Sequence, residues 1–310
     1  MKQHLHWQGL KPADRGASVA MGNFDGVHLG HQALIDLARG HGAPLGVVTF
    51  EPHPREHFQP GHGPFRLMNA ESRSHRMARL GVEQLYELPF DAELAGLTPE
   101  EFVRQILVEG LGVAHVVVGE DFRFGHRRAG TAEDLVRLGA IHGFGVTLAP
   151  ILCRDGDGSA ISSSAIRQVL SEGRPRDAAA MLGHWHRIEG EVIHGHKLGR
   201  ELGFPTANMS VAGLHLPKLG VYAVKVDILD GPAPSSHMGA ASLGVRPMFG
   251  ENLPNLETHL LDFKGDLYGR HLSVAFVEYL RPELKFDGLD ALVAQMNLDC
   301  EDARRILAGI

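Results

Sequence analysis

Two histidines stand in a glycine-rich segment, residues 21–31, which reads MGNFDGVHLGH. His28 and His31 are three residues apart, so one helical turn would place both imidazoles on the same side. The glycines, which allow tight turning and a close approach of the backbone to a ligand, are Gly22, Gly26 and Gly30. The imidazoles could donate hydrogen bonds to phosphate oxygens, and the N-terminus of a following helix would add unpaired N–H groups and its positive dipole end.

Two other interpretations of this segment stay open at this point. A glycine-rich turn between a strand and a helix can be purely structural, and the segment does not contain the GxGxxG motif. The HxxH spacing also suits a pair of metal ligands, but no clear third ligand for zinc accompanies the two histidines. Phosphate binding therefore needs support from the rest of the chain.

A second glycine-rich run, residues 190–208, reads GEVIHGHKLGRELGFPTAN. It contains no GxxxxGK[ST] phosphate loop, and the chain has neither the HRD nor the DFG motif of protein kinases. Further along, Glu257 opens the segment ETHLLDF. Taken alone, a single glutamate at the start of a strand is more often a solvated surface residue than a catalytic one.

Length and composition are typical of a globular protein with two domains. The chain has 310 residues, 44% hydrophobic and 22% charged, with a formal net charge of −7 when its 20 histidines are counted as neutral. No long basic tract indicates a nucleic-acid surface. Cys153 and Cys300 form no CxxC pair, and the N-terminus lacks the apolar run of a signal peptide. Since no stretch approaches about 18 consecutive apolar residues, we expect no membrane span and a cytoplasmic location.

The first part of the chain alternates apolar strands with helices. Strands are predicted at residues 18–21, 45–50, 85–88, 115–118 and 146–149. Helices are predicted at residues 31–39, 72–80, 99–109 and 131–139. This alternation indicates βαβ units and a mostly parallel sheet. The histidine segment falls between the first strand and the first helix, at the carboxyl end of a strand, where open α/β sheets bind ligands.

The pattern changes after about residue 185. Strands are predicted at residues 187–193, 220–229, 240–245, 257–263 and 271–280, and a final helix at residues 289–307. Two short helical pieces, residues 164–170 and 176–181, come before the change. We therefore predict two domains: an α/β domain over residues 1–184, and a small β-barrel with a C-terminal helix over residues 185–310.

Four segments of the first part together resemble a known family. Residues 22–31 closely match the HxGH signature of nucleotidyltransferases, in the GxFDGxHxGH form that is characteristic of FAD synthetases. Residues 48–54 (VTFEPHP), the loop that begins GEDFRFG at residue 119, and residues 161–167 (ISSSAIR) resemble further segments of that family, in the expected order. The GxxLGRxLGFPTAN run resembles riboflavin kinase. Over residues 17–305 the chain resembles the bifunctional bacterial riboflavin kinase/FAD synthetase family.

The resemblance implies that a Rossmann-like nucleotidyltransferase domain transfers the adenylyl group of ATP to FMN. His28 and His31 are the implied catalytic residues, acting as phosphate binders rather than general bases, because attack by the FMN phosphate needs no protein nucleophile. The other implied nucleotide-binding residues are Gly22, Phe24, Asp25, Gly26, Gly30, Ser162, Ser163, Ser164 and Arg167. The implied flavin contacts are Asp121, Phe122 and Phe124, although the two phenylalanines alone would more often belong to a core.

For the second domain, the resemblance implies phosphorylation of riboflavin to FMN. Glu257 is the implied base that accepts the ribityl hydroxyl proton. Thr206 and Asn208 are the implied Mg²⁺ ligands, which is reasonable because magnesium prefers oxygen donors. Gly195 and Gly199 are implied to lie over the nucleotide phosphates. Arg281 is an implied flavin contact, with a structural ion pair as an equal alternative.

The expected function is therefore a bifunctional enzyme with riboflavin, FMN and FAD as substrates or products, ATP as co-substrate and Mg²⁺ as cofactor. One alternative is that a single site has lost activity. Another is a flavin- or nucleotide-binding regulator, which would bind without releasing ADP or pyrophosphate. We expect no nucleic-acid or membrane partner, and a monomer or weak homo-oligomer.

Overall fold

The computed structural model describes the chain except for residues 60, 62, 155, 157, 195–201, 231–234 and 249–250. Two compact units are distinguished. The first consists of residues 1–63 and 73–162, and the second of residues 64–72 and 163–310. Each unit is described by itself.

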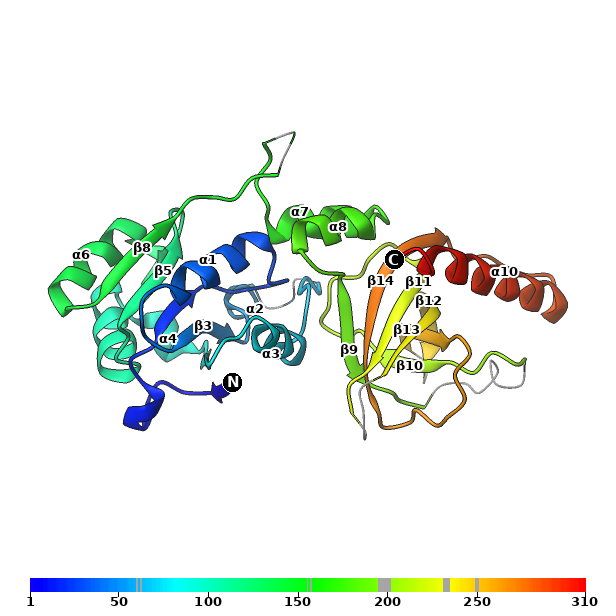
Figure 1. Ribbon diagram of the computed structural model, residues 1–310, viewed down its shortest axis with the longest axis horizontal. Coiled ribbons are helices and arrows are strands. Elements are labelled where there is room, and N and C mark those ends of the chain that lie inside the picture. The colour runs from blue at the N-terminus through cyan, green and yellow to red at the C-terminus, as the bar shows by residue number, and fades with distance from the viewer. Residues whose placement is uncertain are drawn as a thin grey trace. The chain divides into compact units, whose positions relative to one another are not determined.

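The first unit is built on a six-stranded parallel sheet (Figure 1). Its strands are β1 (Lys2–His4), β2 (Ser18–Met21), β3 (Leu45–Glu51), β4 (Gln84–Pro89), β5 (His115–Gly119) and β8 (Gly145–Ala149). The strand order is β1-β4-β3-β2-β5-β8. From β2 the chain first adds β3 and β4 on one side of the sheet, and then β5 and β8 on the other. The β2–β5 pair is the switch point, where doubly wound sheets bind ligands at the carboxyl ends of their strands. The predicted parallel sheet is confirmed, and the edge strand β1 was not predicted.

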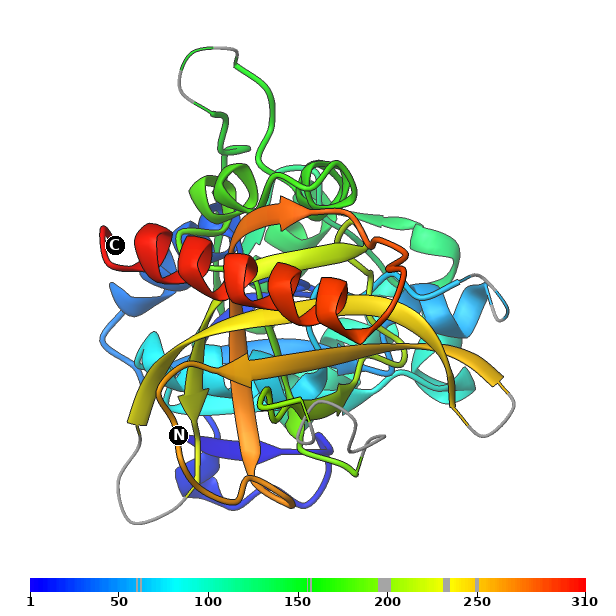
Figure 2. The ribbon, with the colours of Figure 1, turned by 90° about the vertical axis from the view of Figure 1, so that its right-hand side faces the viewer.

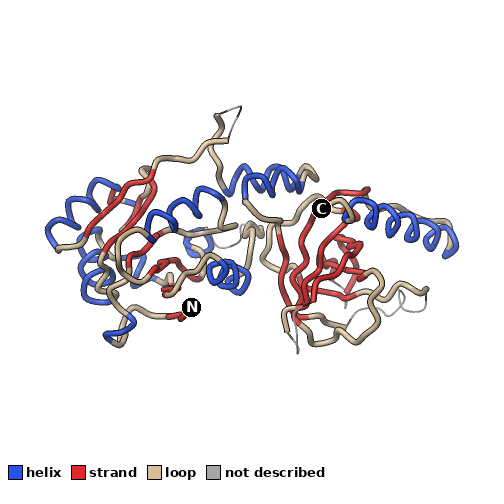
Figure 3. The backbone as a smooth tube through the Cα atoms, viewed as in Figure 1, coloured by secondary structure: helices blue, strands red, loops and turns tan. Residues whose placement is uncertain are grey.

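Helices alternate with these strands along the chain (Figure 3). They are η1 (Pro12–Asp14), α1 (Leu29–Arg39), α2 (Pro54–Phe58), α3 (Ala70–Arg79), α4 (Ala92–Gly96), α5 (Pro99–Glu101), η2 (Phe102–Gly110), η3 (His126–Arg128) and α6 (Ala132–His142). The short strands β6 (Arg123–Phe124) and β7 (Gly130–Thr131) pair before α6. The helix predicted at residues 99–109 forms, but η2 is a π-helix, and the N–H of Leu111 bonds to the carbonyl of Ile106 at 2.8 Å.

Helices cover both faces of the sheet because successive side chains of a strand point to opposite sides. On one face, Ser18 Oγ donates a 2.7 Å hydrogen bond to the carbonyl of Ala38 at the end of α1. On the other face, Val19 and Met21 belong to a core that also contains Ile106 of η2 and other apolar residues of that helix and of α6. The sheet is therefore buried on both sides, which explains why its strands read as continuous apolar runs.

The second unit is an antiparallel barrel, with strands β9 (Arg187–Glu191), β10 (Ala207–Ser210), β11 (Gly220–Ile228), β12 (Ser235–Met248), β13 (Glu251–Leu260) and β14 (His271–Arg281). The order is β10-β13-β12-β11-β14-β9, and the N–H of Ile193 bonds to the carbonyl of Asn208 at 2.9 Å. This contact joins the two ends of the order and nearly closes the barrel. The predicted all-β domain is confirmed. However, β13 begins six residues before Glu257, because backbone pairing with β12 extends through residues 251–256 (ENLPNL), in which apolar and polar residues do not alternate.

Among its described residues, the second unit contains the helices α7 (Ser163–Ser171), α8 (Pro175–Leu182) and α10 (Leu289–Leu307). The bounds of α10 agree with the prediction. This helix lies across the outside of the barrel strands, where Cys300 and Ala303 pack with Ala223 of β11 and Val277 of β14 (Figure 2). In the described part of the chain, no helix is both long enough and apolar enough to cross a membrane.

The buried His186 predicts that acid destabilises the second unit. Its ring lies 5.7 Å from the Phe276 ring, and its Nε2 has no hydrogen-bond partner among the described residues. Burial, and to a smaller extent nearby histidines, lowers the pKa of His186 from 6.5 to about 3. The unfolded chain therefore takes up this proton first. The free energy of unfolding should decrease as the pH falls below 6.5, by about 2 kcal/mol between pH 7 and pH 5.

Urea unfolding followed by circular dichroism at these two pH values measures the effect. The variant His186→Leu removes the titrating group and should lose correspondingly less stability over the same interval. Equal losses in both proteins would show that His186 does not contribute.

Candidate functional site

The turn that joins β2 to α1 is held against β3. The N–H of Gly22 donates to the carbonyl of Val48 at 3.1 Å, and Thr49 Oγ1 donates to the carbonyl of Asn23 at 3.2 Å. Three residues of the turn have left-handed backbone angles: Phe24 (φ 52°), Gly26 (φ 86°) and Val27 (φ 45°). This conformation is unusual for a bulky or β-branched residue. The side chains of Phe24 and Val27 are fully buried, so packing of the surrounding core holds the turn in shape.

His28 is the residue at which α1 begins. Its Nδ1 accepts a hydrogen bond from the N–H of His31 at 3.4 Å and so caps the helix. The two rings are stacked, with centroids 3.6 Å apart and planes inclined by 19°. A Cβ atom at Gly30 would lie 3.2 Å from the His28 ring, which is closer than a side chain normally approaches. Glycine at this position therefore leaves the space that the His28 imidazole occupies.

Both imidazoles are neutral at pH 7. Burial lowers the pKa of His28 from 6.5 to about 4. Burial, followed by the neighbouring His28, lowers the pKa of His31 well below 6.5. Because Nδ1 of His28 accepts a hydrogen bond, its neutral ring carries the proton on Nε2 and can donate from there. Nδ1 of His31 is buried without a partner among the described residues. Such rings are weak bases but suitable donors to an anion at a helix N-terminus.

The structure brings together the predicted residues of the turn and of the first turn of α1, which are Gly22, Phe24, Asp25, Gly26, His28, Gly30 and His31. The carbonyl of Ile161 lies 3.9 Å from the Cβ position of Gly30. This contact places the segment that contains Ser162 beside the start of α1. The predicted residues Ser163, Ser164 and Arg167 are on α7, in the second unit, where Arg167 Nε donates to the carbonyl of Phe65 at 2.6 Å.

The predicted flavin contacts of the first unit follow β5, the neighbour of β2 at the switch point. Asp121 is exposed, Phe122 is half-buried and Phe124 is buried. The rings of Phe122 and Phe124 are 5.9 Å apart and nearly parallel, and Phe124 also packs 5.7 Å from Phe102. Phe124 therefore belongs to the core, as the alternative interpretation suggested. Phe122 packs against this core and is partly exposed.

An aromatic cluster that the sequence analysis missed follows β3 and β4. The rings of His57 and Phe58 on α2 each lie 5.6 Å from that of Phe90, and Phe50 lies 5.7 Å from Phe90 on the inner side. Phe58 is 60% exposed, so its ring lies at the surface of the first unit. We call His57, Phe58 and Phe90 the aromatic cluster. The signal in the sequence was Phe58, an aromatic residue four positions after the VTFEPHP segment; it could have indicated the aromatic cluster.

In the second unit, the strand register brings the predicted kinase residues together. Asn208 of β10 lies directly opposite Glu257 of β13, so the two side chains leave the sheet on the same face. The amide of Asn208 is buried and donates to the carbonyl of Thr206 at 3.4 Å. Asn255, which the sequence analysis missed, donates to Asn208 Oδ1 at 3.0 Å. The amide of Asn208 and the carboxylate of Glu257 thus belong to adjacent strands, and Thr206 directly precedes β10.

His259 is a second residue of this region that sequence reasoning missed. Its Nδ1 lies 2.8 Å from the carbonyl of Pro205, and its ring packs at 5.4 Å against Phe204. A His259 ring that donates from Nδ1 would hold the backbone just before Thr206. His259 is two residues after Glu257, and alternate residues of a strand share a face. This spacing was the signal in the sequence that could have identified His259.

The remaining predicted residues are not brought to this cluster by any described contact. Gly195 and Gly199 lie outside the described residues. The guanidinium of Arg281 makes a two-point ion pair with Asp299 of α10, at 2.8 and 2.7 Å, and Gln295 supports the same carboxylate at 3.0 Å. This is the structural ion pair that the sequence left open, and the flavin contact of Arg281 stays a prediction.

Comparisons with known proteins bear on both units. The family model for FAD synthetase matches residues 10–165, and that for riboflavin kinase matches residues 182–307. A bifunctional riboflavin kinase/FMN adenylyltransferase of Pseudomonas fluorescens is 43% identical over 304 residues, covering 96% of both chains. One from Escherichia coli K12 is 40% identical over 294 residues, covering 93% of this chain and 92% of the relative. A solved structure described as a macrolide-efflux protein from Streptococcus pneumoniae superimposes with a TM-score of 0.82 and 31% identity, covering 98% of both chains.

The lowered pKa of His28 predicts the protonation state of its ring, which NMR can measure. In protein with ¹⁵N-labelled histidine, the His28 ring should be neutral at pH 6 with its proton on Nε2, and should titrate near pH 4, because burial disfavours the charged ring. The variant His28→Gln assigns the signal. A His28 ring that is already protonated at pH 6 would contradict the description of a neutral donor.

Proposed function

We propose that two separate sets of residues carry the two activities of this chain, which belongs to the family of bifunctional riboflavin kinase/FMN adenylyltransferases. The chain phosphorylates riboflavin with ATP to give FMN, and it adenylylates FMN with ATP to give FAD and pyrophosphate. The observation that carries the division is that His28 and His31 belong to the first unit, whereas Asn208 and Glu257 belong to the second.

In the adenylyl transfer, a phosphate oxygen of FMN attacks the α-phosphorus of ATP and the bond to pyrophosphate breaks. Nε2–H of His28 and the N–H of the His31 ring donate to phosphate oxygens, with the N-terminus of α1 adding its dipole. Because the donors are fixed before ATP arrives, little reorganisation is needed as charge moves onto the leaving group. Ser162, Ser163, Ser164 and Arg167 supply further hydroxyl and guanidinium donors to the triphosphate.

In the kinase reaction, the ribityl hydroxyl attacks the γ-phosphorus of ATP and ADP leaves. Glu257 accepts the proton of that hydroxyl. The oxygens of Thr206 and Asn208 are the donors that would hold Mg²⁺, and this all-oxygen set fits the preference of magnesium. When bound, Mg²⁺ neutralises charge on the phosphate oxygens. Gly195 and Gly199 are the further nucleotide-binding residues proposed from the sequence, and Arg281 is the proposed flavin contact.

The flavin ring in the adenylylating unit packs against exposed aromatic surface. Asp121, Phe122 and Phe124 are the flavin contacts proposed from the sequence. Of the two phenylalanines, only Phe122 is partly exposed, and the aromatic cluster adds Phe58. A planar, apolar ring system gains most from stacking against aromatic side chains that already lie at the surface. The half-buried Phe122 and the exposed Phe58 both follow strands at the carboxyl edge of the sheet, which supports this assignment.

We further propose that the boundary between the two functional domains lies between residues 184 and 185. The relatives compared above are bacterial biosynthetic enzymes with small-molecule substrates. We propose, as the sequence predicts, that this enzyme works in the cytoplasm as a monomer or weak homo-oligomer. Neither nucleic acid nor membrane is among its partners.

Separate sites predict separable losses of activity. Glu257→Gln should abolish FMN formation and spare adenylylation of added FMN, because it removes only the base of the kinase unit. His28→Ala should do the reverse. A chromatographic time course with riboflavin, or with FMN, plus excess ATP and Mg²⁺ measures both reactions. Glu301→Gln and His142→Ala, at exposed positions, are the matched controls. Loss of both activities in one folded variant would contradict the division.

Because the His28 ring occupies the space beside Gly30, we expect that a methyl group added at Gly30 impairs adenylylation. Gly30→Ala should slow adenylylation of FMN about tenfold or more, because the new Cβ displaces the His28 ring from its fixed position. Riboflavin phosphorylation should not change. Gly40→Ala at the other end of α1 is the control, since its Cβ would meet only a carbonyl at 3.7 Å. Unaltered adenylylation in folded Gly30→Ala would show that the ring position is not critical.

A further inference from the structure

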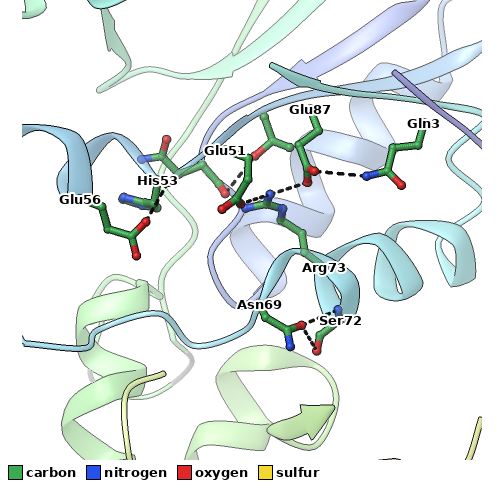
Figure 4. Close-up of polar contacts among 10 residues, drawn as sticks. Gln3, Glu51, His53, Glu56, Asn69, Ser72, Arg73 and Glu87 are labelled. Atoms are coloured by element: carbon green, nitrogen blue, oxygen red, sulfur yellow. Dashed lines mark hydrogen bonds and ion pairs between the residues drawn. The ribbon is translucent and has the colours of Figure 1, made fainter. Parts of the chain in front are cut away.

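One buried arginine in the first unit contacts two carboxylates (Figure 4). Nη2 of Arg73, on α3, donates to Glu51 Oε2 at 2.8 Å and to Glu87 Oε2 at 2.6 Å. The side chains of Arg73 and Glu87 are 3% and 6% exposed, and that of Glu51 is 31% exposed. We call Glu51, Arg73 and Glu87 the Arg73 cluster. Glu51 belongs to the VTFEPHP segment, but neither that resemblance nor the proposed mechanism gives the Arg73 cluster a role.

Stability alone does not account for this arrangement. A buried ion pair costs several kcal/mol of desolvation per ion, and well-packed apolar residues are often as stabilising. Glu87 is satisfied on both oxygens, since Gln3 of β1 donates to its Oε1 at 3.2 Å. Glu51 is different because it is the last residue of β3 and faces the carboxyl edge of the sheet. The geometric effect of Arg73 is therefore to fix the end of β3 to α3 and β4.

The position of Glu51 affects both parts of the aromatic cluster, Phe90 and the helix α2. The backbone carbonyl of Glu51 accepts a 3.1 Å hydrogen bond from the N–H of Phe90. Two residues beyond Glu51, His53 caps α2, and the N–H of His53 donates to Glu56 Oε2 at 3.3 Å. A helix as short as α2, with five residues, does not hold its conformation alone. Glu51 is thus the shared support of Phe90 and of the helix that carries Phe58.

We propose that Arg73 is a positioning residue for FMN in the adenylyl transfer. By holding the Glu51 carboxylate, it fixes both parts of the aromatic cluster against which the flavin ring packs. This inference rests on the proposed function of the first unit and names a residue that determines its affinity for FMN. Arg73 lies beneath the surface and acts only through Glu51.

The test compares kinetic constants for FMN adenylylation in matched variants. The main variant is Arg73→Met with Glu87→Gln, because Arg73→Met alone would leave Glu87 buried, charged and without its cation, which is strongly destabilising. The double variant removes the support of Glu51 while keeping the amide contact to Gln3 possible. Its KM for FMN should rise about tenfold, with kcat reduced by less than about threefold. Riboflavin phosphorylation by the same preparation should be unchanged and shows that the second unit is intact.

Two further variants distinguish loss of the Arg73–Glu51 contact from general destabilisation of the first unit. Arg73→Lys keeps the positive charge on a shorter side chain without the planar guanidinium, so its KM for FMN should lie between those of the wild type and the double variant. Arg79→Met, on the exposed side of the same helix, should leave both constants unchanged. Thermal unfolding of each protein shows whether the first unit remains folded.

An unchanged KM for FMN in a folded double variant would overturn the inference, as would a loss confined to kcat. Phe58→Ala, measured in parallel, should raise the same KM; if it does not, the aromatic cluster is not the flavin surface and the inference is wrong. Full adenylylation by His28→Ala would instead contradict the proposed function. The two failures are distinguishable because the KM comparison does not depend on which residues bind the phosphates.

Discussion

The adenylylating unit depends on the hydrogen bond between His28 Nδ1 and the N–H of His31. This one contact begins α1, sets the tautomer of His28 and stacks the two rings. Burial keeps both rings neutral, so they can act as donors at the N-terminus of α1 and not as cations, which the helix dipole disfavours there. The left-handed turn, its anchoring on β3 and the missing side chain at Gly30 all serve to place His28 where this bond forms.

The second unit reaches phosphate chemistry by a different physical route. Its candidate residues are not at a helix start but on neighbouring strands, where the register sets Asn208 opposite Glu257. Cross-strand pairing fixes the separation of such side chains as firmly as a helical turn does. Contacts from Asn255 to the amide and from His259 to the backbone before Thr206 then restrict the oxygen donors. In the proposed sites, the first unit thus relies on a helix dipole and imidazole N–H groups, and the second on side-chain oxygens.

Buried charge is used sparingly and is paired within each unit. In the first unit, the guanidinium of Arg73 is shared by Glu51 and Glu87; in the second, Arg281 engages Asp299. Groups that have no such partner are neutral instead, as burial makes His28 and His186. Both solutions avoid an uncompensated ion in the interior. They also make the fold sensitive to acid, because the neutral histidines must become charged as the chain unfolds at low pH.

The sequence by itself determined the parallel sheet, the all-β unit, the bounds of α10 and the chain positions of the motifs, because apolar periodicity and glycine-rich turns are local signals. It missed β1 and β10 and placed the start of β13 too late, since these strands exist through pairing with distant segments. Only the tertiary structure decided that Asn208 faces Glu257, that Asp299 holds Arg281 and that Arg73 supports Glu51. Each of these contacts joins residues far apart in the chain, and no local pattern of residues encodes which partner the packing brings near.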